Sequence, residues 1–165
     1  MNSKHLLHQK ENTLQEITVS KILSLNAITE KYGLILTESD AIEIIKTQKR
    51  ALKNNYRFEF GSDTVSKLIF AFSDSPYLTQ SNYLETMHDL IELFYHFKSE
   101  THEALDDDSL IQLMKDYFDR VCEGSMELLS MKDLETMALQ LRQAKLDFST
   151  VRDAHHWYEW EEWND

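Results

Sequence analysis

Residues that form tight turns are scarce in this chain, which has three glycines and one proline in 165 residues. β-Sandwiches and β-barrels need many turns, and those turns need glycine and proline. The chain is instead rich in leucine, glutamate, lysine and glutamine, which favour helices. The sequence therefore predicts an all-α fold, a mostly helical bundle of about six helices.

The length of the chain is typical of one domain that buries a sizeable core without disulfides or metals. Hydrophobic residues make up 42% of it, which is close to ordinary globular usage. We expect residues 1–150 to form a single helical domain. Residues 151–165 differ in composition, and we expect them to form a separate acidic, tryptophan-rich C-terminal tail.

The stretch from Lys67 to Lys98 contains the one proline, Pro76, and the densest run of aromatic residues. We expect two helices here, joined by a Ser-Asp-Ser-Pro corner, because the residue before a proline disfavours helical geometry. In the second helix, apolar and aromatic side chains recur at helical spacing and form one wide face. That face predicts a central, structural helix.

One segment has the period of a strand rather than of a helix. Residues 56–60 are Tyr-Arg-Phe-Glu-Phe, an alternation of aromatic and charged side chains that ends at Gly61. A strand needs a partner, and the short apolar run 34–36 is the expected one. One interpretation is therefore a minor two-stranded β element near residues 34–36 and 57–60. The alternative is an extended aromatic loop that lies on the helical core.

The balance of charge limits the partners of the chain. Its formal net charge is −12, which opposes binding to nucleic acid or to an anionic membrane. No apolar run approaches the roughly 20 residues of a membrane span, and the N-terminus lacks the apolar core of a secretory signal. The single cysteine, Cys122, excludes an internal disulfide framework. We expect a soluble cytoplasmic protein that binds neither nucleic acid nor membrane.

The motifs of common enzyme classes are missing from the sequence. Phosphate-binding loops need two or three glycines within about eight residues, whereas Gly33, Gly61 and Gly124 lie far apart. Cys122 ends a predicted helix and precedes Glu123, and both features oppose the thiolate form that a nucleophile needs. We therefore predict no catalytic residue and favour a protein that is not an enzyme.

Two Glu/His pairs have the spacing of metal ligands on a helix, namely Glu85 with His88 and Glu92 with His96. On a helical wheel, Glu85, Glu92 and His96 lie opposite the apolar face, whereas a metal site in a bundle lies inside it. We therefore expect a solvated face there, with no metal ion and no cofactor.

Four cations recur at helical spacing in one part of the chain: Lys46, Arg50, Lys53 and Arg57. If their helix reaches Arg57, they form one basic stripe with Lys49 beside it, and no acidic residue interrupts the stripe. One interpretation is a binding site for an acidic partner. The other is that these cations complement the C-terminus of their helix and pair with acidic neighbours.

All tryptophans of the chain, Trp157, Trp160 and Trp163, lie within seven residues of the tail. Such large apolar side chains are rarely left in water, so we expect the tail to pack on its own domain, to contact another copy or to bind a protein partner. The tail also carries five acids: Asp153, Glu159, Glu161, Glu162 and Asp165. One hypothesis from charge is that the tail docks near the basic stripe, in the same chain or across a dimer.

Polar and aromatic residues gather at the proline corner, between Ser73 and Asn82. Here Asp74, Ser75, Tyr77 and Asn82 are candidates for a pocket that binds a small molecule or a metal. Turn formation and helix capping explain the same residue types. A buried polar pocket would favour a ligand-binding function, whereas a solid corner with satisfied caps would favour a protein that binds other proteins.

Short segments spread from about residue 25 to 129 resemble a family of small, uncharacterised, helical bacterial proteins, a domain of unknown function. The segments that carry the resemblance include Tyr32-Gly33-Leu34, Glu59-Phe60-Gly61, Lys67-Leu68-Ile69, Asp74-Ser75-Pro76-Tyr77 and Phe94-Tyr95. The resemblance implies a helical fold. It implies no activity and no functional residue, because none is established for the family.

Together these observations predict a non-enzymatic interaction or scaffold protein of the bacterial cytoplasm. Its expected partner is an unidentified protein or a second copy of the same chain. The alternative function is the binding of a small molecule or metal near the Ser73–Asn82 corner.

Overall fold

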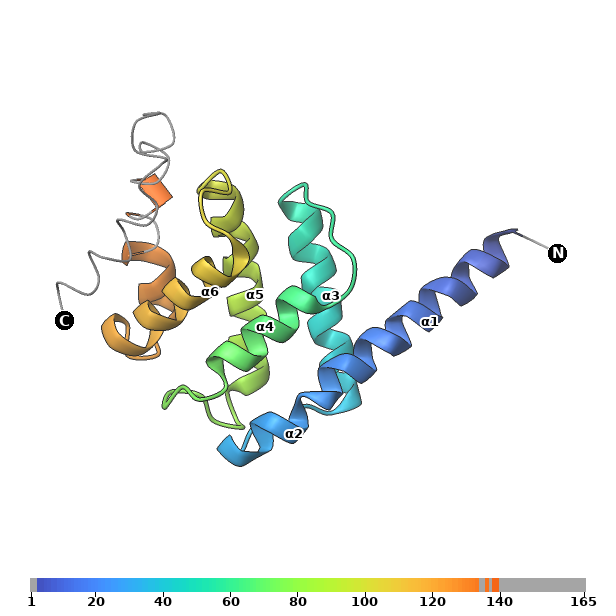
Figure 1. Ribbon diagram of the computed structural model, residues 1–165, viewed down its shortest axis with the longest axis horizontal. Coiled ribbons are helices and arrows are strands. Elements are labelled where there is room, and N and C mark those ends of the chain that lie inside the picture. The colour runs from blue at the N-terminus through green and yellow to red at the C-terminus, as the bar shows by residue number, and fades with distance from the viewer. Residues whose placement is uncertain (1–2, 134–135, 137, 140–165) are drawn as a thin grey trace.

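The computed structural model describes residues 3–133, 136 and 138–139 (Figure 1). The described α-helices are α1 (Ser3–Ser24), α2 (Asn26–Thr29), α3 (Glu38–Asn54), α4 (Asp63–Phe72), α5 (Tyr83–Glu100), α6 (Asp107–Asp116) and α7 (Met126–Leu128). The other described helical elements are η1 (Glu30–Tyr32), a 3-10 helix, and two π-helices, η2 (Tyr117–Val121) and η3 (Leu129–Asp133). The prediction of an all-α fold is confirmed.

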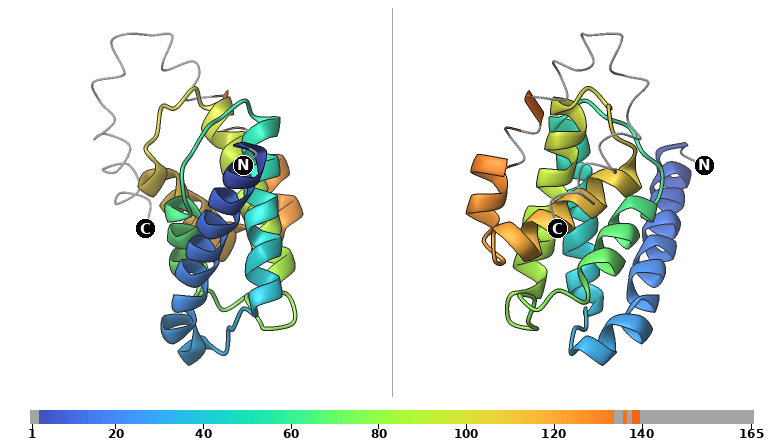
Figure 2. Two further views of the ribbon diagram at one scale, coloured as in Figure 1. Left: turned by 90° about the vertical axis from the view of Figure 1, so that its right-hand side faces the viewer. Right: turned by 60° about the vertical axis from the view of Figure 1, so that its left-hand side comes forward.

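Helices α3 and α5 form the centre of the molecule. They pack directly against each other and run in the same direction. Helix α4, which lies between them in the sequence, carries the chain back to the end where α5 begins (Figures 1 and 2). The loops that follow α3 and α5 therefore lie at one end of the molecule, and the proline corner lies at the other. The C-terminal part of α1 packs on α3 and α4, while its N-terminal part projects from the body (Figure 1).

The core is aliphatic and aromatic, and α5 contributes more large buried side chains than any other described helix. Its apolar face buries Tyr83, Met87, Leu90, Ile91, Phe94, Tyr95 and Phe97. Phe72 from α4 and Phe118 from η2 pack edge to face, with ring centroids 5.4 Å apart. The wide aromatic face predicted for the second helix of the Lys67–Lys98 stretch is thus the central packing surface.

The start of α3 illustrates how local sequence sets a helix boundary. The Thr37 hydroxyl accepts a hydrogen bond from the Asp40 amide at 3.1 Å, and the Asp40 carboxylate accepts one from the Thr37 amide at 2.9 Å. This capping box satisfies two amides that the first helical turn leaves unpaired. At the start of α6, the Asp106 side chain caps the helix by accepting a hydrogen bond from the Ser109 amide at 2.7 Å.

The predicted two-stranded β element is wrong, because no strand occurs among the described residues. Side-chain amides occupy the backbone groups that a strand partner would use. Gln80 bonds to both backbone groups of Ile35 at 2.8 Å, and Asn26 bonds to both of Leu36 at 2.8 and 2.9 Å. Residues 34–36 are therefore tied to α2 and to the proline corner, away from residues 57–60.

None of the helices within the described ranges combines the length and the apolar character that crossing a membrane requires.

Candidate binding surface

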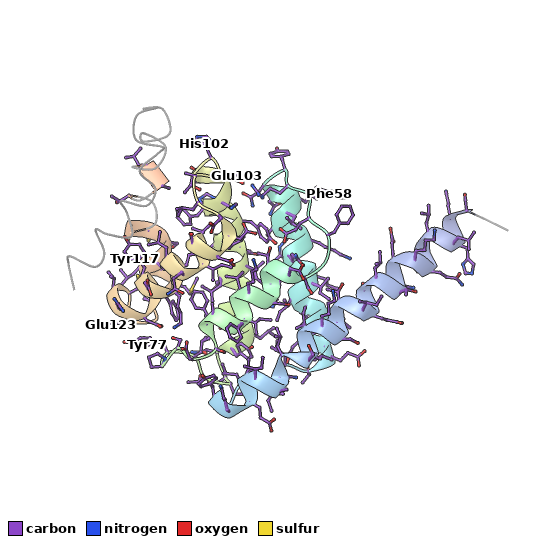
Figure 3. All side chains as sticks on the ribbon, viewed as in Figure 1. Phe58, Tyr77, His102, Glu103, Tyr117 and Glu123 are labelled. Carbon is purple, nitrogen blue, oxygen red and sulfur yellow. The ribbon has the colours of Figure 1, made fainter. Side chains whose placement is uncertain are left out.

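The loop between α3 and α4 exposes three aromatic side chains at alternate positions of residues 56–60. Tyr56 is 99% exposed, and Phe58 and Phe60 are each 84% exposed. Figure 3 shows Phe58 at the outer edge of this loop, pointing away from α3. Phe58 and Phe60 contact each other edge to face, with ring centroids 5.0 Å apart. The alternation predicted from the sequence is present, but its aromatic side faces solvent.

The charged side of the same alternation faces the protein. The Arg57 guanidinium forms an ion pair with Glu103 at 2.6 Å, which joins the α3–α4 loop to the loop after α5. The Arg57 amide donates to the carbonyl of Leu52 at 2.8 Å. Tyr56 and Glu103 both have positive φ, at 53° and 59°. Such backbone geometry is costly for residues other than glycine and often occurs at functional sites.

A polar network beneath the loop holds Glu59. Its carboxylate accepts hydrogen bonds from the hydroxyls of Tyr95, at 2.9 Å, and of Thr64. The Gln48 side chain donates to the Tyr95 hydroxyl at 3.3 Å and to the carbonyl of Gly61 at 3.1 Å. Gln48, Thr64 and Tyr95 are buried, and burial raises the pKa of Tyr95, so this hydroxyl stays protonated and keeps donating.

This network fixes the loop through its charged residues and leaves the aromatic residues uncovered. A fully buried phenylalanine contributes about 1.5–3 kcal/mol relative to an exposed one, so Phe58 and Phe60 leave that stabilisation unused in the domain alone. Exposed apolar groups that are adjacent and held in place mark sites of protein contact. The loop therefore has the geometry of a binding surface.

The basic stripe lies on the solvent-facing side of α3, next to this loop, and differs from the prediction in one respect. Helix α3 ends at Asn54, so Arg57 lies beyond the helix and turns toward Glu103. Two further stripe residues also form ion pairs: Lys46 with Glu43 at 3.4 Å, and Arg50 with Glu92 at 2.8 Å. Three of the four stripe residues thus have an acidic neighbour in the fold.

Two exposed lysines on this side of α3 have no ion-pair partner within the part of the chain that the structure describes. They are Lys49 and Lys53. Lys53 lies in the last turn of α3, three residues before Tyr56. We call these two lysines together with Tyr56, Phe58 and Phe60 the loop surface. It combines the exposed aromatic side chains of the loop with two exposed lysines of the helix that precedes it, in a chain whose net charge is −12.

The candidate pocket residues of the proline corner have polar or packing partners in the fold. Asp74 forms an ion pair with Lys115 at 2.9 Å, and the Ser75 hydroxyl donates to Asp119 at 2.6 Å. Lys115 also pairs with Asp119 at 2.6 Å. Burial alone would lower the pKa of Lys115, but the hydrogen bonds to Asp119 and Asp74 outweigh it and raise that pKa.

Tyr77 and Asn82 complete the corner. The Tyr77 ring packs on Phe118 with centroids 6.3 Å apart, and Gly124 lies so close that an added Cβ would be 2.5 Å from the Tyr77 Cβ. Figure 3 labels Tyr77 near Glu123, the residue before this glycine. The Asn82 side chain accepts a hydrogen bond from the Thr79 amide at 2.8 Å and donates one to the Tyr77 carbonyl at 3.0 Å. All four predicted pocket residues thus serve to hold the corner.

An open groove of about 380 Å³ lies elsewhere, between α5 and the segment that follows α6. It is lined by Asp89, Glu92, Leu93, His96, Met126, Glu127 and Ser130. Burial, followed by the nearby carboxylates of Glu85 and Glu92, raises the pKa of Asp89. The sequence places Glu92 and His96 on a solvated face but does not reveal the groove, because the residues of its second wall lie thirty or more residues further along the chain.

Among the described residues, no group of three or more histidine, cysteine, aspartate or glutamate side chains is arranged to hold a metal ion. Glu85, Glu92 and His96 are exposed, as predicted. His88 contacts the Thr47 hydroxyl and so joins α5 to α3. The predicted partner-binding residues Trp157, Trp160 and Trp163 lie outside the described residues.

The fold and the surface together define an all-α domain with one aromatic, partly basic face. The chain belongs to a family of unknown function (DUF6323), whose model matches residues 21–147. The match includes the whole loop surface and the proline corner. No curated protein and no solved structure matches the chain.

Proposed function

We propose that this protein is a non-enzymatic interaction protein that binds an acidic, aromatic-containing segment of another protein at the loop surface. The observation that carries the proposal is the orientation of residues 56–60. Their aromatic side chains face solvent, whereas their charged side chains face the protein and bond to Tyr95 and Glu103. Exposed tyrosine and phenylalanine side chains on a fixed backbone supply contact area at low entropic cost.

The charges beside the loop support an acidic partner. Lys49 and Lys53 are exposed and unpaired within the described ranges, so they are available to carboxylates. Charge complementarity of this kind guides association and selects among partners. The same lysines are too few to bind nucleic acid against a net charge of −12.

A bacterial cytoplasmic location is part of the proposal. It rests on the resemblance described above and on the single cysteine, Cys122, which is buried and not part of a disulfide. Ligand binding at the proline corner is not favoured, because Asp74, Ser75 and Asn82 already have polar partners there.

The test is selection of binding peptides from a random library against the full-length protein. We expect the selected peptides to combine acidic with aromatic residues and to lose binding to a Tyr56→Ser/Phe58→Ser/Phe60→Ser variant. A Phe70→Ser variant is the control, since Phe70 is 60% exposed but lies on α4 outside the loop surface. Selected peptides that bind the triple variant as well as the wild type would refute the proposal.

A further inference from the structure

We propose that the chain's own C-terminal tail, residues 151–165, binds the loop surface of the same molecule and closes it to other partners. This inference rests on the proposed function, because it assigns an occupant to the same surface. It makes the protein self-inhibited, so that a partner must displace the tail before it binds.

Charge is the first argument for this occupant. The tail has five acids and one basic residue, Arg152, which gives it a formal charge of −4. The loop surface contains Lys49 and Lys53, which have no ion-pair partner in the described part of the chain. An acidic segment attached to an acidic domain is repelled by most of its surface, so exposed cations without an acidic partner are favoured positions for it. Lys4, Lys10 and Lys21 of α1 are also exposed and have no ion pair in the described part of the chain, but α1 contains no phenylalanine, tyrosine or tryptophan, whereas Lys49 and Lys53 precede three exposed aromatic side chains.

Aromatic content is the second argument. The tail contains the tryptophans Trp157, Trp160 and Trp163, and the loop surface exposes three aromatic side chains that the rest of the described fold leaves uncovered. Aromatic pairs contribute about 0.5–1.5 kcal/mol beyond the burial of their area. Docking would therefore cover two sets of apolar side chains at once.

The length of the connection allows the tail to reach this surface within one molecule. The last described residue is Leu139, and eleven residues separate it from the tail. Eleven residues span up to about 36–40 Å when extended. A compact domain of about 140 residues has a radius of gyration of only about 14 Å. A short tether also gives the tail an effective concentration of about millimolar, which favours its own domain over a second copy.

Tryptophan fluorescence of the full-length protein tests the proposal directly, because all tryptophans of the chain lie in the tail. We expect the wild-type emission to be shifted to the blue of a synthetic 151–165 peptide. A Phe58→Ser/Phe60→Ser variant and a Lys49→Glu/Lys53→Glu variant should both shift it back toward the peptide. The matched controls are Phe70→Ser and Lys4→Glu/Lys10→Glu, which alter exposed residues outside the loop surface and should leave the emission unchanged.

Dilution distinguishes the same molecule from a second copy. Docking within one chain gives an emission that does not change with protein concentration, whereas a red shift on dilution would overturn the intramolecular assignment. Wild-type emission equal to that of the free peptide would also overturn the proposal, as would loop-surface variants that leave a blue-shifted emission unchanged.

A second measurement keeps the test independent of variant folding. In the full-length Trp157→Ser/Trp160→Ser/Trp163→Ser variant, the tail loses its aromatic groups and the chain contains no tryptophan. The added 151–165 peptide should bind this variant at least about tenfold more tightly than the wild type, since the loop surface is vacant. Equal affinity for both would overturn the inference. The proposed function is tested separately, by whether peptides selected from the library need the aromatic residues of the loop in order to bind.

Discussion

At the scale of single residues, the buried hydroxyl of Tyr95 is the group on which the geometry of the loop surface depends most. It donates to Glu59 and accepts from Gln48, so its removal leaves both with fewer hydrogen bonds. We expect Tyr95→Phe to lower the free energy of unfolding by about 1–2 kcal/mol. Urea denaturation measures this, with Tyr56→Phe as a matched control that should change nothing. Equal stability of the Tyr95 variant and the wild type would mean that the network does not hold the loop.

Lys115 has the corresponding role at the proline corner. Its side chain is 13% exposed and pairs with Asp74 and Asp119. Lys115→Ala leaves the less exposed Asp119 without its counter-ion, and we expect a loss of about 2 kcal/mol of stability. Lys46→Ala breaks an exposed pair with Glu43 and should cost about 0.5 kcal/mol or less. A loss in the Lys115 variant as small as in this control would show that the corner is held by packing alone.

The pH dependence of the Lys115 contribution has a definite sign. Because the folded protein raises the pKa of this lysine, its ion pairs stabilise the fold fully below the ordinary lysine pKa of 10.5. The contribution is lost as the pH rises through the higher folded pKa. Stability curves of wild type and Lys115→Ala should therefore converge above that pH and stay apart at neutral pH.

At the scale of elements, the groove beside α5 concentrates negative charge around Asp89. The folded state raises the pKa of Asp89, so its ionised form is disfavoured there and its contribution to stability is greatest below the ordinary aspartate pKa of 3.8. We expect Asp89→Asn to stabilise the protein at pH 7 by about 0.5 kcal/mol or less, because the residue is solvent-screened. Thermal melting should show this gain at pH 7 and none near pH 3, and a gain at both would contradict it.

Local signals predicted the elements well where the partners are near in sequence. The sequence around Pro76 predicts one helix on each side of it, and α4 ends at Phe72 while α5 begins at Tyr83. The prediction of the β element was wrong because the partner of residues 34–36 is distant in the sequence. The side chain of Gln80 forms hydrogen bonds with the backbone amide and carbonyl of Ile35, and the two residues are 45 positions apart in the chain. No pattern within residues 34–36 could indicate a partner at that distance.

At the scale of the whole molecule, the sequence predicted the cations of α3 and the extended residues 56–60 of the candidate surface, but not which side of the loop faces solvent. Helical spacing grouped the cations of α3, and period two identified residues 56–60 as extended. Which side of that segment faces the protein depends on Thr64, at the start of α4, and on Tyr95, 36 residues away from Glu59 in the chain; both hydroxyls donate to Glu59. Charged side chains are expected outside, so the alternation alone favours the wrong orientation.

The central claim is that Phe58 and Phe60 serve binding. The affinity of one selected peptide for three full-length proteins tests it most directly. All three have the tail tryptophans replaced by serine, and two also have Phe58→Ser/Phe60→Ser or Phe70→Ser. We expect the peptide to bind the loop variant at least about tenfold more weakly than its parent and the Phe70 variant about equally well. Equal affinity for all three, with unchanged circular dichroism, would contradict it.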